Sequence, residues 1–99
     1  MVLLLDAGPA LREVARVLGF GAQKYSKHGW RESMDAPGGD QVEWGRNVSA
    51  ALRHLEAWYQ GETYDPESGI NHLAHAICDL MFVLTYQVLG KGKDDRYGS

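Results

Sequence analysis

Three residues near the carboxyl end of the chain could do chemistry, and their spacing brings them together. His72, His75 and Asp79 are separated by three and four residues, which places them on one face of an α-helix. Imidazole and carboxylate groups bind divalent metal ions and transfer protons. Burying them in an apolar helix costs free energy unless each has a partner. This polar stripe is the first candidate for a metal or catalytic site, and an interhelical hydrogen-bond network is the alternative interpretation.

A second set of polar residues precedes the stripe. Arg53 and His54 lie on a predicted helix, and Glu62 and Asp65 lie in the short acidic turn that follows it. A short connection makes consecutive helices antiparallel neighbours, so this turn should lie close to the start of the stripe. Carboxylates mixed with imidazoles suit Mg²⁺, Mn²⁺ or Zn²⁺. The alternative is that Glu62 and Asp65 are solvated turn or capping residues.

Basic and aromatic residues elsewhere suit a phosphorylated ligand. Arg46 and Arg53 are seven residues apart on one helix face, and Lys24 is available from the first part of the chain. Arginine in pairs recognises phosphate through bidentate hydrogen bonds. Tyr25 and Trp30 could stack on a base. Surface salt bridges and core packing are the alternatives for these residues.

The apolar pattern predicts three main helices, at about 8–18, 40–60 and 70–89. Gly19 and Gly21 should weaken or break the first helix. Residues 26–40 read as a long loop. Asp40 with Glu43 resembles a capping box at the start of the second helix.

The third predicted helix is apolar on most sides, which is typical of a buried helix. Asp65 or Ser68 could cap its start, and residues 91–99 are expected to form a loose tail. The sequence therefore predicts an all-α fold with a single domain over residues 1–99. So small a domain buries a modest share of its surface, so we expect oligomerisation to complete the bundle.

Composition narrows the classes of function. The formal net charge of −3 argues against a general nucleic-acid binder, because phosphate-backbone affinity needs clustered Lys and Arg. Cys78 has no second cysteine to pair with and should pack as a small hydrophobic residue. We expect no membrane-spanning segment, since no stretch reaches about 18 apolar residues. A cytoplasmic protein fits these features.

Several short motifs occur in a characteristic order along the chain. They are Gly21-Ala22-Gln23-Lys24-Tyr25, Trp30-Arg31, Arg46, Ala51-Leu52-Arg53-His54, Ala57-Trp58, Gly61-Glu62, Asp65-Pro66-Glu67-Ser68-Gly69 and His72-Leu73-Ala74-His75-Ala76. Over roughly residues 5–89 this order resembles the phage-encoded dATP/dGTP diphosphohydrolase N-terminal domain family. That family looks like a relative of the MazG-type all-α nucleotide pyrophosphohydrolases, which are obligate oligomers that use Mg²⁺ or Mn²⁺.

The resemblance implies roles for particular residues. His54, Glu62 and His75 would be catalytic, with His54 able to serve the metal side or the phosphate side of the site. Lys24, Arg46 and Arg53 would face the phosphates, with Tyr25 and Trp30 as further substrate-binding residues. The implied metal set is Glu62, Asp65, His72, His75 and Asp79.

One departure from the MazG pattern concerns the acidic residues. That pattern has paired glutamates on one helix and Glu-x-x-Asp on the next, whereas this chain offers His54 and Glu56 on the first helix. Ala76 stands three residues before Asp79 on the second helix. Either imidazoles replace carboxylates here, or the number of metal ions differs.

The resulting expectation is hydrolysis of dGTP or dATP to a monophosphate and pyrophosphate, with Mg²⁺ or Mn²⁺, by a homodimer or homotetramer. If the chain is phage-encoded, it would act in the host cell cytoplasm. The alternative is a non-catalytic helical oligomerisation or nucleotide-binding module. A relative of the His-Asp phosphatases ranks last, because the sequence lacks an adjacent His-Asp pair.

Overall fold

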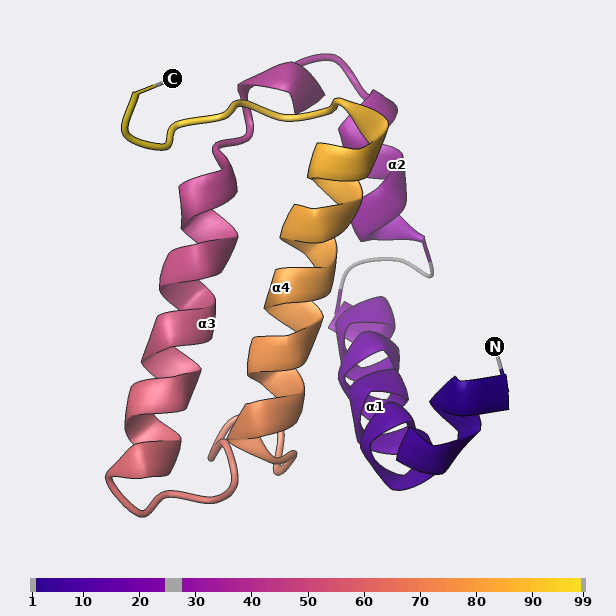
Figure 1. Ribbon diagram of the computed structural model, residues 1–99, viewed down its shortest axis with the longest axis vertical. Helices are drawn as coiled ribbons and strands as arrows, with labels where there is room; N and C mark the ends of the chain where they lie inside the picture. Colours follow the sequence, from indigo (N-terminus) through magenta and orange to yellow (C-terminus); the bar gives the residue numbers. More distant parts are fainter. Residues whose placement is uncertain (1, 25–27, 99) are drawn as a thin grey trace.

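The computed structural model describes residues 2–24 and 28–98, and its secondary-structure elements are all helices (Figure 1). The elements are η1 (Val2–Ala7), α1 (Gly8–Lys24), α2 (Gly29–Asp35), η2 (Gly39–Gln41), α3 (Trp44–Tyr59) and α4 (His72–Leu89), where η denotes a short 3₁₀ helix. No β-strand occurs in these two ranges. The all-α prediction is confirmed.

Helix α4 is the centre of the arrangement. It runs antiparallel to α3 on one side and packs against α1 on the other (Figure 1). Small buried residues line both α3 and α4, including Ala51, Ala76 and Cys78, and small side chains let helix backbones approach closely. The main apolar cluster joins α1 to α4 and its preceding turn, through Val14, Val17, Ile70, Ala74 and Cys78.

Helix α1 is longer than the sequence predicts. It passes through Gly19 and Gly21 without a break and ends at Lys24. Leu18 and Phe20 pack on the apolar cluster beside these glycines. Tertiary packing of the amphipathic face therefore outweighs the low helix propensity of glycine.

The predicted loop over residues 26–40 contains two helical elements. Helix α2 buries Met34 to 1% exposure, and the ring centroid of Trp30 lies 4.5 Å from that of Phe82 on α4. These contacts hold a short helix that its composition did not indicate. The segment 25–27, which includes Tyr25, lies outside the described residues.

The capping prediction for the second main helix was wrong. Asp40 belongs to η2, and Glu43 occupies the N-cap position of α3 without a side-chain cap. At α4 the capping residue is Asn71, whose side-chain oxygen accepts a hydrogen bond from the backbone N–H of Leu73 at 2.8 Å. Asp65 and Ser68 lie farther back in the turn and have other partners.

The carboxyl-terminal segment, expected to be loose, crosses from the end of α4 to the start of α3 (Figure 1). The indole N–H of Trp44 donates to the Lys91 carbonyl at 2.9 Å, and the backbone N–H of Gly45 donates to Asp95 at 3.0 Å. The backbone N–H of Trp44 also donates to the Lys93 carbonyl. The two backbone bonds pair N–H groups at the start of α3 that have no partner within the helix. This pairing explains why the carboxyl-terminal segment is held in place.

The outer face of α3 and α4 carries exposed apolar side chains, contrary to the expectation that the last helix is buried. They are Val48, Leu52, Leu55, Tyr59, Ile77, Leu80, Leu84 and Val88, which we call the outer apolar face. One chain supplies α4 with neighbours on only part of its circumference, which leaves this face uncovered.

Helix α4 also meets the length and composition of a membrane span, with 18 residues at a mean hydropathy of 1.3. The expectation that no segment reaches this length therefore needs correction. A helix in the core of a folded domain can satisfy the same criteria. Helix α4 packs against α1 and α3 and carries the polar stripe, as a core helix of a folded domain can.

Candidate functional site

The turn over residues 60–71 places two polar side chains beside α4. The Asp65 backbone N–H donates to the Ile70 carbonyl at 2.9 Å, and the Gly69 N–H donates to the Asp65 carbonyl at 2.7 Å. The Asp65 carboxylate accepts from the Glu67 N–H at 2.7 Å, and the Ser68 hydroxyl accepts from the Ile70 N–H at 3.1 Å. The turn is thus closed on itself and holds Asp65 and Ser68 in fixed positions.

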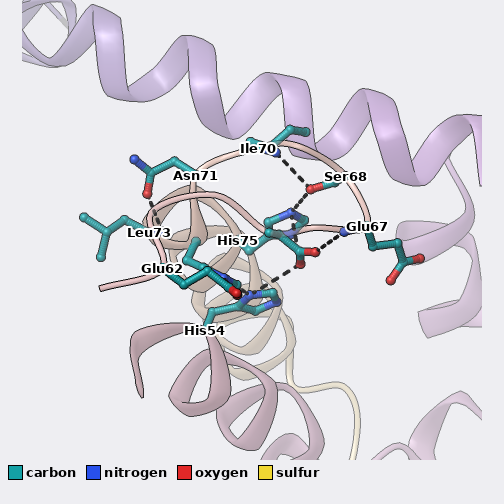
Figure 2. A network of polar contacts seen from close by, with 10 residues as sticks. His54, Glu62, Glu67, Ser68, Ile70, Asn71, Leu73 and His75 are labelled. Carbon is teal, nitrogen blue, oxygen red and sulfur yellow. Dashed lines mark hydrogen bonds and ion pairs between the residues drawn. The ribbon is translucent and has the colours of Figure 1, made fainter. Parts of the chain in front are cut away.

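Helices α3 and α4 bring His54 and His75 to this turn (Figure 2). The rings of His54 and His75 are stacked, with centroids 4.6 Å apart and planes inclined by 10°. His54 Nδ1 lies 3.8 Å and His75 Nε2 lies 3.9 Å from the same Asp65 oxygen. His75 Nε2 also lies 2.7 Å from the Ser68 hydroxyl oxygen.

The third histidine, His72, is 4% exposed and lies behind His54. Its Nε2 is 2.7 Å from a Glu62 carboxylate oxygen, and its Nδ1 is 2.8 Å from His54 Nδ1. A chain of polar contacts therefore runs from Glu62 in the turn through His72 on α4 to His54 on α3.

Burial favours neutral rings in this cluster. Desolvation lowers the pKa of His54, and the neighbouring charge on His75 lowers it further, against an opposing effect of Asp65. Desolvation likewise lowers the pKa of His75, again opposed by Asp65. Neutral imidazole is the form that binds metal ions and accepts protons.

His54, Asp65 and His75 fit the requirements of a divalent-cation site, and we call them the His54 cluster. One ligand atom from each lies within 4.8 Å of the other two, and all three residues are partly buried. Three donors that share one small ion lie about 3 to 4 Å apart, so the side chains would have to move inward by up to about 1 Å to bind it. Two imidazoles and a carboxylate form a donor set for Mn²⁺ and Zn²⁺ as well as Mg²⁺.

A cleft of about 880 Å³ extends from the His54 cluster along α4. Its polar end contains the cluster and Glu67, while its other end is lined by apolar and aromatic residues that include Phe20, Trp30 and Phe82. A cavity of this volume is within the range of small-molecule sites. Arg46 and Asn47 also line the cleft. Polar and aromatic lining residues together suit a ligand with phosphates and a ring.

Asp79 lies apart from the His54 cluster, although it shares a helix face with His75. It lines the cleft one turn beyond His75. Burial raises the pKa of Asp79 to about 6, with Arg53 opposing the shift. No side chain in the described part of the chain forms a hydrogen bond or ion pair with Asp79.

The predicted phosphate-binding residues are divided between two surfaces. Arg46 lines the cleft, and with Arg53 it also lines a shallower groove on α3 of about 530 Å³. Trp30 lines the cleft as expected. Lys24 ends α1, but its side chain, like Tyr25, lies outside the described residues.

Ser68 is the site residue that sequence reasoning missed, because it was considered only as a helix cap. Its hydroxyl contacts His75 and fixes the turn at the Ile70 N–H. Its place within Asp65-Pro66-Glu67-Ser68-Gly69, which supports the resemblance, was the available signal. Cys78 behaves as expected: it is 1% exposed, and burial raises the pKa of its thiol to about 12.

Comparison with known proteins supports the motif-based resemblance. The chain is 36% identical over 84 residues to a dATP/dGTP diphosphohydrolase of Salmonella phage PMBT28, a match that covers 85% of this chain and 26% of that protein. The chain thus spans about a quarter of the length of that relative. No solved structure matches this chain. The family described as "dATP/dGTP diphosphohydrolase, N-terminal" matches residues 1–96, and the chain belongs to this family.

Proposed function

We propose that this chain carries the site of a metal-dependent hydrolase that splits purine deoxynucleoside triphosphates, dGTP or dATP, into monophosphate and pyrophosphate. The observation that carries the proposal is the His54 cluster at the polar end of a nucleotide-sized cleft. The printed name of the phage relative supports this substrate class, although that protein is much longer.

The residues of the cleft divide the work along its length. His54, Asp65 and His75 would hold Mg²⁺ or Mn²⁺, which when bound supplies Lewis acidity at the phosphates and lowers the pKa of a bound water. Arg46 lines the same cleft about two helical turns from His54 and would supply fixed positive charge to the substrate there. Trp30 and Phe82 offer aromatic surface to the base at the other end. Asp79, between these ends, would contact the substrate rather than the cation.

Self-association is part of the proposal. The outer apolar face spans two neighbouring helices and is larger than the scattered apolar residues normal on a monomer surface. A second copy presenting the same two helices would cover it as a four-helix bundle. We propose a homodimer as the basic unit, with a homotetramer as the larger alternative.

A non-catalytic nucleotide-binding module is the second candidate. The chain corresponds to only 26% of the phage relative, so the bond-breaking residues could lie elsewhere in such a longer protein. The cleft alone would then account for binding.

A hydrolysis screen separates these two functions. The chain is incubated with each common ribo- and deoxynucleoside triphosphate and Mg²⁺ or Mn²⁺, and pyrophosphate and orthophosphate are measured separately. The proposal predicts pyrophosphate from dGTP or dATP only when metal is present. His75→Ala should abolish it while the circular dichroism spectrum of the helices is retained. Undiminished turnover in His75→Ala would refute the proposed site, and nucleotide binding without turnover would favour the binding module.

A further inference from the structure

Both ring nitrogens of His72 already have protein partners. Nε2 lies 2.7 Å from the Glu62 carboxylate and Nδ1 lies 2.8 Å from His54 Nδ1, while the residue is 4% exposed. An imidazole binds a metal ion through an unprotonated nitrogen that faces the ion. His72 would have to break one of these contacts to become a ligand. Within the described residues, His54 and His75 each have a hydrogen-bond partner at one ring nitrogen only, so the role of His72 differs from theirs.

The Glu62 carboxylate fixes the direction of the hydrogen bonds. An ionised carboxylate only accepts, so the N–H of His72 must lie on Nε2. In the neutral form of His72 this is the single N–H of the ring, which leaves Nδ1 as an acceptor. His54 Nδ1 must then donate to it, and the lone pair of His54 is confined to Nε2. One carboxylate thus determines the tautomer of two rings in succession.

We propose that Glu62 and His72 are positioning residues that hold His54 in the Nδ1–H tautomer. The lone pair of His54 would then lie on Nε2, and not on the Nδ1 atom that is 3.8 Å from Asp65. The catalytic meaning of this role rests on the function proposed above, but the tautomer itself does not. Partners that orient a ligating or proton-accepting histidine act in this way in metal sites generally. Glu62 suits the role because its side chain is about half exposed and reaches inward to a buried ring.

The test is the ¹⁵N chemical shift of each imidazole nitrogen, read from long-range ¹H–¹⁵N correlations of the chain without metal or nucleotide at about pH 8. Protonated and unprotonated ring nitrogens have well-separated shifts. The proposal predicts a protonated Nδ1 and an unprotonated Nε2 for His54, with the reverse for His72. A protonated Nε2 on His54 would overturn it.

Variants show whether Glu62 is the cause. Glu62→Ala removes the acceptor, so His54 should acquire a substantial population of the Nε2–H tautomer. Glu62→Gln keeps a carbonyl oxygen that can accept from His72, and it should restore the Nδ1–H tautomer in part. Glu56→Ala is the matched control, because it removes an exposed carboxylate two residues from His54 and should leave the shifts unchanged. If the His54 shifts in Glu62→Ala equal those of the unmodified chain, Glu62 is not a positioning residue.

Activity is measured separately, so that the two proposals can fail independently. Glu62→Ala should lower kcat for dGTP or dATP by about 10- to 100-fold, with little change in helical content. If the unmodified chain shows the predicted tautomers but no hydrolysis, the proposed function fails and this inference stands. If it hydrolyses nucleotide with His54 protonated on Nε2, the inference fails and the proposed function stands.

Discussion

Asp79 projects from α4 into surroundings that disfavour its charge. Burial raises its pKa from 3.8 to about 6, although Arg53 acts in the opposite direction. A carboxyl group whose pKa is higher in the folded state binds its proton more tightly there. The protonated carboxyl therefore favours the folded state below about pH 4, and this stabilisation is lost as the pH rises from about 4 to about 6. Above about pH 6 the effect of Asp79 on the free energy of unfolding no longer changes with pH. At neutral pH the ionised carboxylate opposes folding.

Asp79→Asn should therefore stabilise the chain at high pH. An amide of the same shape carries no charge to desolvate, so the free energy of unfolding should rise by about 1–2 kcal/mol at about pH 8. At about pH 4 the wild-type group is protonated in the folded state, and most of the gain should disappear. Urea denaturation at the two pH values measures the difference. A gain in the free energy of unfolding that does not depend on pH would contradict a raised pKa for Asp79.

The types of the site residues were predictable, but their pairing was not. The spacing of His72 and His75 indicated a shared helix face, and the acidic turn indicated nearby carboxylates. The division of roles depends on which ring nitrogen meets which partner, as in the 2.8 Å contact between His54 and His72. That contact depends on the approach of two helices and the path of the turn, which no spacing along one helix encodes.

At the scale of elements, the turn over residues 60–71 controls the site. It carries Asp65 and Ser68, and its closure depends on the Gly69 N–H bond to the Asp65 carbonyl. Gly69 has a φ of +73°, in the left-handed region that disfavours side chains. The left-handed conformation explains why the Asp65-Pro66-Glu67-Ser68-Gly69 motif ends in glycine.

A pair of glycine substitutions tests this role. Gly69→Ala should lower the free energy of unfolding by about 1–2 kcal/mol, because a Cβ is strained at that φ. Gly19→Ala, in helical backbone with nothing within 4 Å of an added Cβ, should raise it by about 0.5–1 kcal/mol. Thermal or chemical denaturation measures both changes. Equal effects of the two substitutions would show that the left-handed conformation of the turn is unimportant.

Helix identity was predictable from the apolar period, whereas helix ends were decided by contacts distant in sequence. The start of α3 at Trp44 depends on residues 91–95, which supply hydrogen-bond partners about fifty positions away. Helix α2 depends on the packing of Trp30 against Phe82. Local signals such as Asp40 with Glu43 could not reveal either of these interactions.

For the whole molecule, the outer apolar face is the feature that a single chain leaves incomplete. The sequence indicated an apolar last helix, but composition did not reveal which side its neighbours would cover. Ile77, Leu80 and Leu84 are between 42% and 58% exposed. The hydrophobic effect favours their burial against a second copy.

Leu84→Glu should therefore shift the chain toward monomer. A charge at the centre of an apolar contact is costly to bury, so the dimer dissociation constant should rise by at least about tenfold, equivalent to 1.4 kcal/mol. Leu11→Glu, on the exposed side of α1, is the matched control. Analytical ultracentrifugation across a concentration series measures both variants. A monomeric wild-type chain, or a dimer unaffected by Leu84→Glu, would exclude this face as the interface.

We propose that the His54 cluster is a metal-dependent catalytic site. The most direct measurement is pyrophosphate release from dGTP and dATP as a function of Mn²⁺ concentration, compared between the unmodified chain, Asp65→Asn and the control Glu56→Gln. We expect metal-dependent release that is reduced at least about 100-fold in Asp65→Asn, which corresponds to a loss of about 2.7 kcal/mol in transition-state stabilisation. Glu56→Gln should match the unmodified chain. Release without added metal in the presence of a chelator, or equal release by Asp65→Asn, would contradict the proposal.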